Sequence, residues 1–112
     1  MEITAEAREH VTVIAISGSV DGLTAPSLAQ SFRQHVAEGR VRLVADLSRV
    51  HYTSSAGLRA LLEALKETRQ RGGDLRLAAV QPDVHRVLEL SGFTGILKVF
   101  PDVDAAVKSF PA

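Results

Sequence analysis

Apolar residues recur along the chain with two spacings, one typical of strands and one typical of helices. Residues 10–18, HVTVIAISG, are rich in β-branched side chains and end at a glycine, which predicts a strand buried on both faces or nearly so. Residues 41–47, VRLVADL, and residues 74–80, DLRLAAV, predict two further strands. Residues 2–9, EITAEARE, are expected to form a short antiparallel partner of the first strand, and residues 96–100, ILKVF, a short last strand.

Between these strands the apolar positions return every three or four residues, as on one face of a helix. Thr24 is expected to cap the first helix, with Pro26 in its first turn and Gly39 as its end. The second helix begins near Ser54 and ends at Gly72, and its polar residues fill the face opposite its leucines. The inward-facing residues of these two helices are Leu28, Phe32, Val36, Leu58, Leu61, Leu62 and Leu65.

Two shorter helices are predicted near the carboxyl end of the chain. Residues 82–92 begin with a proline and end with a glycine, and residues 101–110 place Val103, Ala106, Val107 and Phe110 on one face. Strands that alternate with helices predict an α/β domain, with parallel strand pairs joined by right-handed helical crossovers. The sheet should be mixed if the first two strands form a hairpin. No repeat or linker divides the chain, so we expect one domain over residues 1–112.

Composition narrows the possible partners. Lysine and arginine number 13 and balance 13 aspartates and glutamates, and they are scattered, so no nucleic-acid or lipid-binding patch is indicated. The absence of cysteine excludes disulfides, thiolate catalysis and cysteine-ligated zinc, and is compatible with the cytosol. No signal peptide is evident, and the apolar runs are too short to span a membrane. We therefore expect a cytoplasmic protein whose partners are other proteins.

Residues 51–62, HYTSSAGLRALL, bring two serines to the start of the second helix. A serine hydrolase would place a glycine two residues before its nucleophile, but Thr53 stands at that position before Ser55. The four histidines are dispersed, so neither a general base nor a metal site can be assigned, and no cofactor is expected. The glycines in GSVDG and RGGD match no phosphate-binding loop and are interpreted as turns.

Two interpretations of Ser54 and Ser55 remain open from these residues alone. Serine is favoured as a helix cap because its oxygen accepts a hydrogen bond from a free backbone N–H. A hydroxyl at a helix N-terminus is also exposed, and the helix dipole and free amides tolerate a phosphate there. Phosphorylation would then add about −1.5 to −2 charge without disturbing the fold.

Four segments together resemble the STAS domain family, in particular its stand-alone bacterial members, the anti-sigma factor antagonists. These segments are SGSVDGLTAPSL, ADLSRVHYTSSAGLRALL, RGGDLRLAAVQPDVHRVLELSGF and VFPDVDAA, which occur in the family's order and spacing over about residues 8–110. The resemblance implies a mixed, mostly parallel sheet of four to five strands with about four helices packed mainly on one face. It also implies a binding protein rather than an enzyme.

The same resemblance implies roles for particular residues. Ser55 matches the phosphoacceptor, Gly57 and Leu58 match the glycine and leucine that follow it, and Asp21 matches the acidic residue beside the acceptor. Thr24 and Ala25 match the residues that open the first helix. The family usually has an aspartate before the acceptor, where this chain has Ser54, so a negative charge is missing and a second hydroxyl is present.

The mechanism that the resemblance implies is partner switching. The unmodified domain binds an anti-sigma factor, itself a serine kinase of the histidine-kinase-like ATPase fold, and so frees a sigma factor. Phosphorylation of Ser55 reverses binding, and a PP2C-type phosphatase restores it. The expected docking residues are Asp21, Gly22, Leu23, Thr24, Thr53, Ser54, Ala56, Gly57, Arg59 and Glu63.

Plainer interpretations stand beside this one. Arg59 and Glu63 could belong to a solvated helix face, and Asp21 before a glycine is common in turns. An unphosphorylated adaptor or ligand-sensing module of a transport or stress-signalling assembly is the alternative function, and a serine hydrolase is a remote one. The family precedent favours a monomer when the protein is free.

Overall fold

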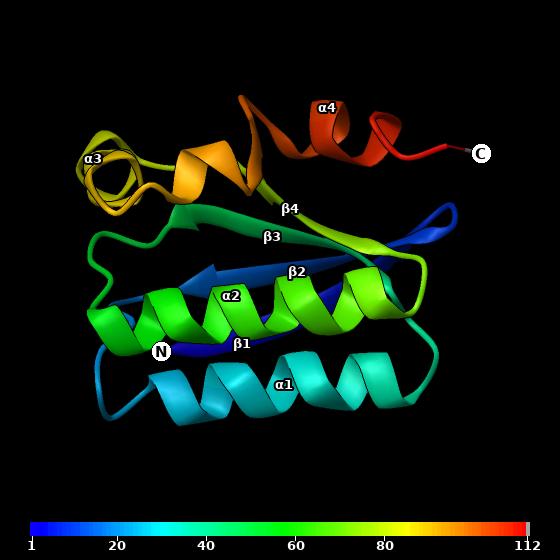
Figure 1. Ribbon diagram of the computed structural model, residues 1–112, viewed down its shortest axis with the longest axis horizontal. Coiled ribbons are helices and arrows are strands. Elements are labelled where there is room, and N and C mark those ends of the chain that lie inside the picture. Colours follow the sequence, from blue (N-terminus) through cyan, green and yellow to red (C-terminus); the bar gives the residue numbers. More distant parts are fainter. Residues whose placement is uncertain (112) are drawn as a thin grey trace.

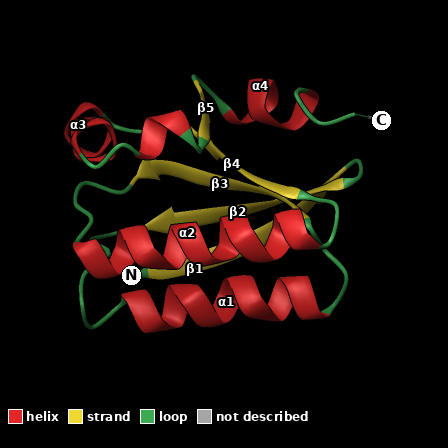
Figure 2. Ribbon diagram, in the orientation of Figure 1, coloured by secondary structure: helices red, strands yellow, loops and turns green. Residues whose placement is uncertain are grey.

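The computed structural model describes residues 1–111 as a five-stranded sheet with helices on both faces (Figure 1, Figure 2). Its elements, in chain order, are β1 (Glu2–Arg8), β2 (Val11–Ser17), α1 (Ala25–Ala37), β3 (Arg42–Arg49), α2 (Ser55–Gln70), β4 (Asp74–Ala78), α3 (Pro82–Leu90), the 3-10 turn η1 (Phe93–Gly95), β5 (Lys98–Phe100) and α4 (Val103–Lys108). All five strands and four helices predicted from the hydrophobic pattern are present.

The strands follow one another in space in the order of the sequence, β1-β2-β3-β4-β5. β1 pairs antiparallel with β2, as expected for a hairpin, and the other neighbouring pairs are parallel. Each parallel pair is joined by a helix, which is the connection that parallel strands require. The predicted mixed, mostly parallel α/β fold is therefore confirmed.

Side chains that alternate along the strands build two separate cores, one on each face of the sheet. On the first face, Ile14 of β2 and Leu43 of β3 pack with buried residues of α1, α2 and α3. On the second face, Val13 and Val44 pack with Ala106, Val107 and Phe110 of the α4 region. Three helices thus share one face while α4 covers the other, which agrees with helices packed mainly on one face.

Helix α1 illustrates how local sequence sets both ends of an element. Pro26 lies in the first turn, and Gly39 follows the last turn with a φ of +87°, a left-handed conformation that glycine adopts without strain. The prediction that Thr24 caps this helix was wrong. Thr24 occupies the N-cap position, but its side chain makes no capping hydrogen bond, since its hydroxyl accepts from the N–H of Asp21 instead.

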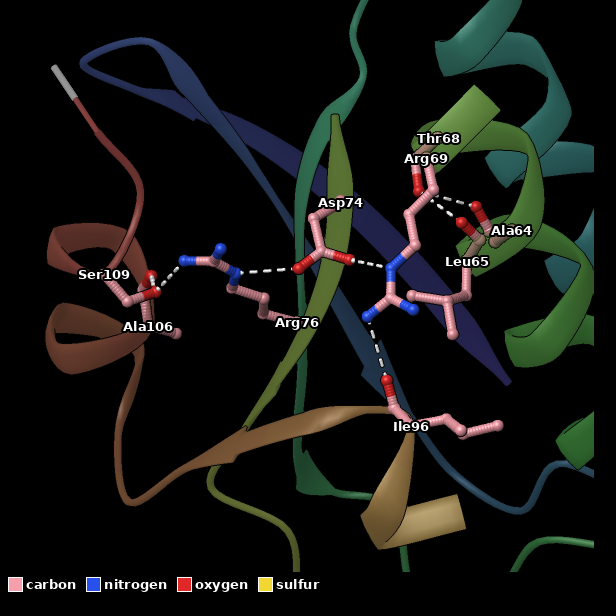
Figure 3. Close-up of polar contacts among 9 residues, drawn as sticks. All are labelled: Ala64, Leu65, Thr68, Arg69, Asp74, Arg76, Ile96, Ala106 and Ser109. Atoms are coloured by element: carbon pink, nitrogen blue, oxygen red, sulfur yellow. Dashed lines mark hydrogen bonds and ion pairs between the residues drawn. The ribbon is translucent and has the colours of Figure 1, made fainter. Parts of the chain in front are cut away.

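A partly buried ion network lies at the start of β4 (Figure 3). Asp74 lies between two guanidinium groups, accepting from Nε of Arg76 and from Nε of Arg69, each at 3.0 Å. Arg76 also donates to Ser109 Oγ at 2.7 Å and lies 4.1 Å from the ring centre of Phe110. The network therefore joins α2, β4 and the residues after α4. The hydrophobic pattern predicted the strand but not these contacts.

Helices α1 and α2 of the first face begin at the same end of the sheet. In Figure 1 the carboxyl ends of β2 and β3 and the first turns of α1 and α2 lie together on the left. α1 and α2 then run side by side across the sheet. This end carries the loops that the sequence identified as the candidate site.

No helix within residues 1–111 combines the length and apolar character needed to cross a bilayer.

Candidate functional site

Two loops meet at the end of the sheet where α1 and α2 begin. The loop after β2 and the loop after β3 form a single parallel bridge between Val20 and Thr53. The N–H of Val20 donates to the carbonyl of Tyr52 at 2.9 Å, and the N–H of Ser54 donates to the carbonyl of Val20 at 2.8 Å. The bridge connects the loop containing Asp21 to the residues that immediately precede α2.

The two adjacent serines have different roles in this structure. Ser54 is the N-cap of α2, and its Oγ accepts a hydrogen bond from the N–H of Gly57 at 3.3 Å. Ser55 is the first residue of the helix, and its side chain is exposed. The capping interpretation thus applies to Ser54, while the hydroxyl of Ser55 remains available to another molecule.

Gly57 allows the first turn of α2 to pack directly on the bridge between the loops. A Cβ at this position would lie 2.3 Å from Thr53 Oγ1 and 2.8 Å from Val20 Cγ1. Gly57 and Thr53 are both buried, so neither can contact a partner directly. These two members of the predicted docking set therefore support the surface from beneath and are not part of it.

Substitution of Gly57 by alanine is expected to destabilise the protein by about 1–2 kcal/mol. Overpacking of a tight contact typically costs about 1–3 kcal/mol. The 2.3 Å approach places this site in the upper part of that range, about 2–3 kcal/mol, and the better helix propensity of alanine offsets about 1 kcal/mol of it. Urea unfolding measures the change. Gly22→Ala is the matched control, because a Cβ there meets nothing within 4 Å. A Gly57→Ala protein as stable as the Gly22→Ala protein would contradict the tight packing.

Asp21 organises the loop before α1. Its Oδ1 accepts hydrogen bonds from the N–H groups of Leu23 at 2.9 Å and Thr24 at 3.0 Å. The backbone N–H of Thr24, followed by that of Leu23, lowers the pKa of the Asp21 carboxyl, since both favour the charged form. The turn interpretation of Asp21 is thus correct. It also leaves an ionised carboxylate on the loop that pairs with the residues preceding α2.

A shallow groove of about 280 Å³ separates the first halves of α1 and α2. Arg33 of α1 and Glu63 of α2 form an ion pair across it at 3.7 Å. Arg59 also lines the groove, and it forms no ion pair with any of residues 1–111. The remaining lining residues are Gly22, Ala25, Pro26, Ala29, Ala56 and Ala60.

Two large apolar side chains are exposed on the bridged loops. Leu23 is 90% exposed and Tyr52 is 54% exposed. The sequence interpretation included Leu23 but omitted Tyr52 and Arg33. Tyr52 is the only tyrosine in the chain and stands directly before Thr53. Its position next to the candidate site could therefore have been used to include it. The exposure of both side chains makes this end suitable for contact with a protein.

The described histidines do not form a catalytic or metal-binding arrangement. His35 contacts Arg40, His51 contacts Gln81 and His85 contacts Glu89, and none of them hydrogen-bonds Ser55. Over residues 1–111, no group of three or more potential ligands is placed to hold a metal ion. A serine nucleophile would need a base within hydrogen-bond reach, so this geometry does not favour a hydrolase.

Comparison with known proteins agrees with this architecture. The STAS domain family matches residues 2–106. BtrV of Bordetella bronchiseptica, provisionally named an anti-sigma factor antagonist, is 36% identical over 98% of this chain and 95% of its own. An anti-sigma factor antagonist from Mycobacterium paratuberculosis has 29% identity and a TM-score of 0.85, covering 96% of this chain and 92% of its own. A Thermotoga maritima structure has 20% identity and a TM-score of 0.91, and it likewise covers 96% of this chain and 92% of its own, which shows the common fold. The chain belongs to the STAS domain family.

Proposed function

We propose that this protein is an anti-sigma factor antagonist that works by partner switching, with Ser55 as its phosphoacceptor. The observation that carries the proposal is that the two adjacent serines differ: Ser54 caps α2, whereas Ser55 is exposed as its first residue. Named relatives that match nearly the whole chain are antagonists of anti-sigma factors, which supports an anti-sigma factor as the partner.

The switch is a single phosphoryl transfer. The anti-sigma factor acts as a serine kinase of the histidine-kinase-like ATPase fold. The γ-phosphoryl group of ATP forms a bond with Ser55 Oγ, its bond to the β-phosphate oxygen breaks, and ADP leaves, while the hydroxyl proton passes to a base of the kinase. A PP2C-type phosphatase hydrolyses the phosphate and regenerates the hydroxyl. The helix N-terminus tolerates the added charge, so the change acts on the surface and leaves the fold intact.

The docking surface surrounds Ser55. Leu23 and Tyr52 supply exposed apolar area on the two loops, and Arg59 supplies a free cation on α2. Aromatic and arginine side chains are the ones that most often dominate binding energy at protein interfaces. Gly22 and Ala56 line the groove together with Arg59. We therefore place the anti-sigma factor over the start of α2 and the entrance of the groove.

The test is phosphorylation by the cognate kinase. The protein is incubated with ATP and the anti-sigma factor, and the phosphate is located by mass spectrometry. We expect one phosphate on Ser55, none in Ser55→Ala, and a phosphate still located on Ser55 in Ser54→Ala, whose fold is checked by circular dichroism. An unmodified Ser55 in the native protein would overturn the switch and favour the unphosphorylated adaptor. A phosphate on Ser54 would overturn the assignment of the acceptor.

A further inference from the structure

Arg59 stands one helical turn after Ser55 on α2. Side chains four residues apart on a helix are neighbours, with about 5–6 Å between their Cβ atoms. Both residues are exposed and both belong to the regular part of the helix, which runs over Ser55–Gln70. Because helical side chains lean toward the N-terminus of their helix, the long Arg59 side chain can reach back to a group added to Ser55 Oγ.

Among residues 1–111, no carboxylate forms an ion pair with Arg59. Glu63, one turn further along α2, is engaged by Arg33 of α1 at 3.7 Å. Asp21, on the loop before α1, directs Oδ1 to the backbone N–H groups of its own turn. An arginine followed four residues later by a glutamate is also the less favourable order for an ion pair within a helix. Arg59 is thus available to an anion at the start of α2.

We infer that Arg59 binds the phosphate on Ser55 within the same helix, so that modification removes a docking cation at the same time as it adds negative charge. The inference rests on the proposed function, because it needs the phosphate at Ser55. The planar guanidinium can donate two parallel hydrogen bonds to phosphate oxygens, and such charge-assisted pairs are stronger than neutral ones. One covalent step then changes two features of the surface that the anti-sigma factor contacts.

The experiment requires neither the kinase nor the anti-sigma factor. Phosphoserine is incorporated at position 55 during translation, and the second ionisation of the phosphate, with an ordinary pKa of about 6, is followed by ³¹P NMR. An opposite charge favours the dianion, so Arg59 lowers this pKa. A surface pair four residues apart has an energy of about 0.2–0.5 kcal/mol. At 1.36 kcal/mol for each pKa unit, Arg59→Gln should raise the phosphate pKa by roughly 0.2–0.4 unit.

Lys66 provides the matched control. It is exposed on the same face of α2, about three turns and roughly 16 Å beyond Ser55. That separation exceeds the screening length of about 8 Å at physiological salt, so Lys66→Gln removes one positive charge without moving the phosphate pKa. Arg59→Lys should retain part of the effect, since it keeps the charge but loses the paired hydrogen bonds.

The inference fails if Arg59→Gln leaves the phosphate pKa at the native value, or if Lys66→Gln raises it equally. Either result would leave the proposed function intact, because exchange of the anti-sigma factor is measured separately. Conversely, if the cognate kinase leaves Ser55 unmodified, the proposed function fails, and a pKa shift then shows only that Arg59 can pair with a phosphate placed at position 55.

Discussion

Replacing Ser55 with aspartate is expected to weaken binding of the anti-sigma factor by about 30-fold or more, while Ser55→Ala retains native affinity. A charge buried at an interface without a partner costs roughly 2–5 kcal/mol. This range corresponds to about 30-fold to several thousand-fold in the dissociation constant. Aspartate carries less charge than a phosphate, so we expect the lower part of the range. Isothermal titration calorimetry with the purified anti-sigma factor measures the difference.

Gln70→Glu is the control for the Ser55→Asp variant. It adds one negative charge to α2 at its last residue, which is exposed and lies at the opposite end of the helix. This variant should bind as the native protein does. If Ser55→Asp bound as tightly as Ser55→Ala, charge at this position could not control docking and the proposed switch would be wrong. Circular dichroism of each variant separates loss of binding from loss of fold.

The second large effect is expected from Asp74→Ala, which should lower the free energy of unfolding by about 3 kcal/mol. The side chains of Asp74 and Arg76 are each only 11% exposed, so the substitution leaves the Arg76 guanidinium buried without its carboxylate. Breaking one partner of a buried ion pair typically costs about 3–5 kcal/mol. We place the loss at the lower end because Arg76 keeps its hydrogen bond to Ser109. Denaturation in urea gives the value.

Two further variants identify the cause of that loss. Asp104→Ala removes a carboxylate from an exposed pair with Arg8, and exposed pairs contribute little, so its effect should be much smaller. Asp74→Leu combined with Arg76→Met removes both buried charges and should recover much of the stability lost in Asp74→Ala. Equal losses in Asp74→Ala and Asp104→Ala would show that burial of the network does not determine its energy.

The helices and strands of this fold could be predicted from the sequence because each depends on residues close together in the chain. The stripe of Leu28, Phe32 and Val36 predicts α1, and Gly39 marks its end because the chain turns there with a positive φ. The strands follow from short runs of β-branched and aliphatic residues. The order of strands and helices then leaves few topologies, since parallel neighbours need helical crossovers.

The candidate site could be predicted from the sequence only in part. Resemblance to a family directed attention to Ser55 and Asp21, but periodicity and spacing alone left capping and modification as alternatives. The same level of reasoning assigned Thr24 a capping hydroxyl that it does not provide, because the competing hydrogen bonds come from residues in the preceding loop. It also placed the buried Thr53 among the docking residues.

Hydrophobic spacing and turn residues, then, determined which segments of this chain are helices and strands and how they connect. Tertiary structure alone decided that Val20 pairs with Thr53, that Gly57 meets Val20, and that Arg76 donates to Ser109. The reason is physical. Secondary structure depends mainly on neighbours a few residues apart, whereas burial, hydrogen-bond partners and exposed charge depend on segments that the fold brings together from distant parts of the chain.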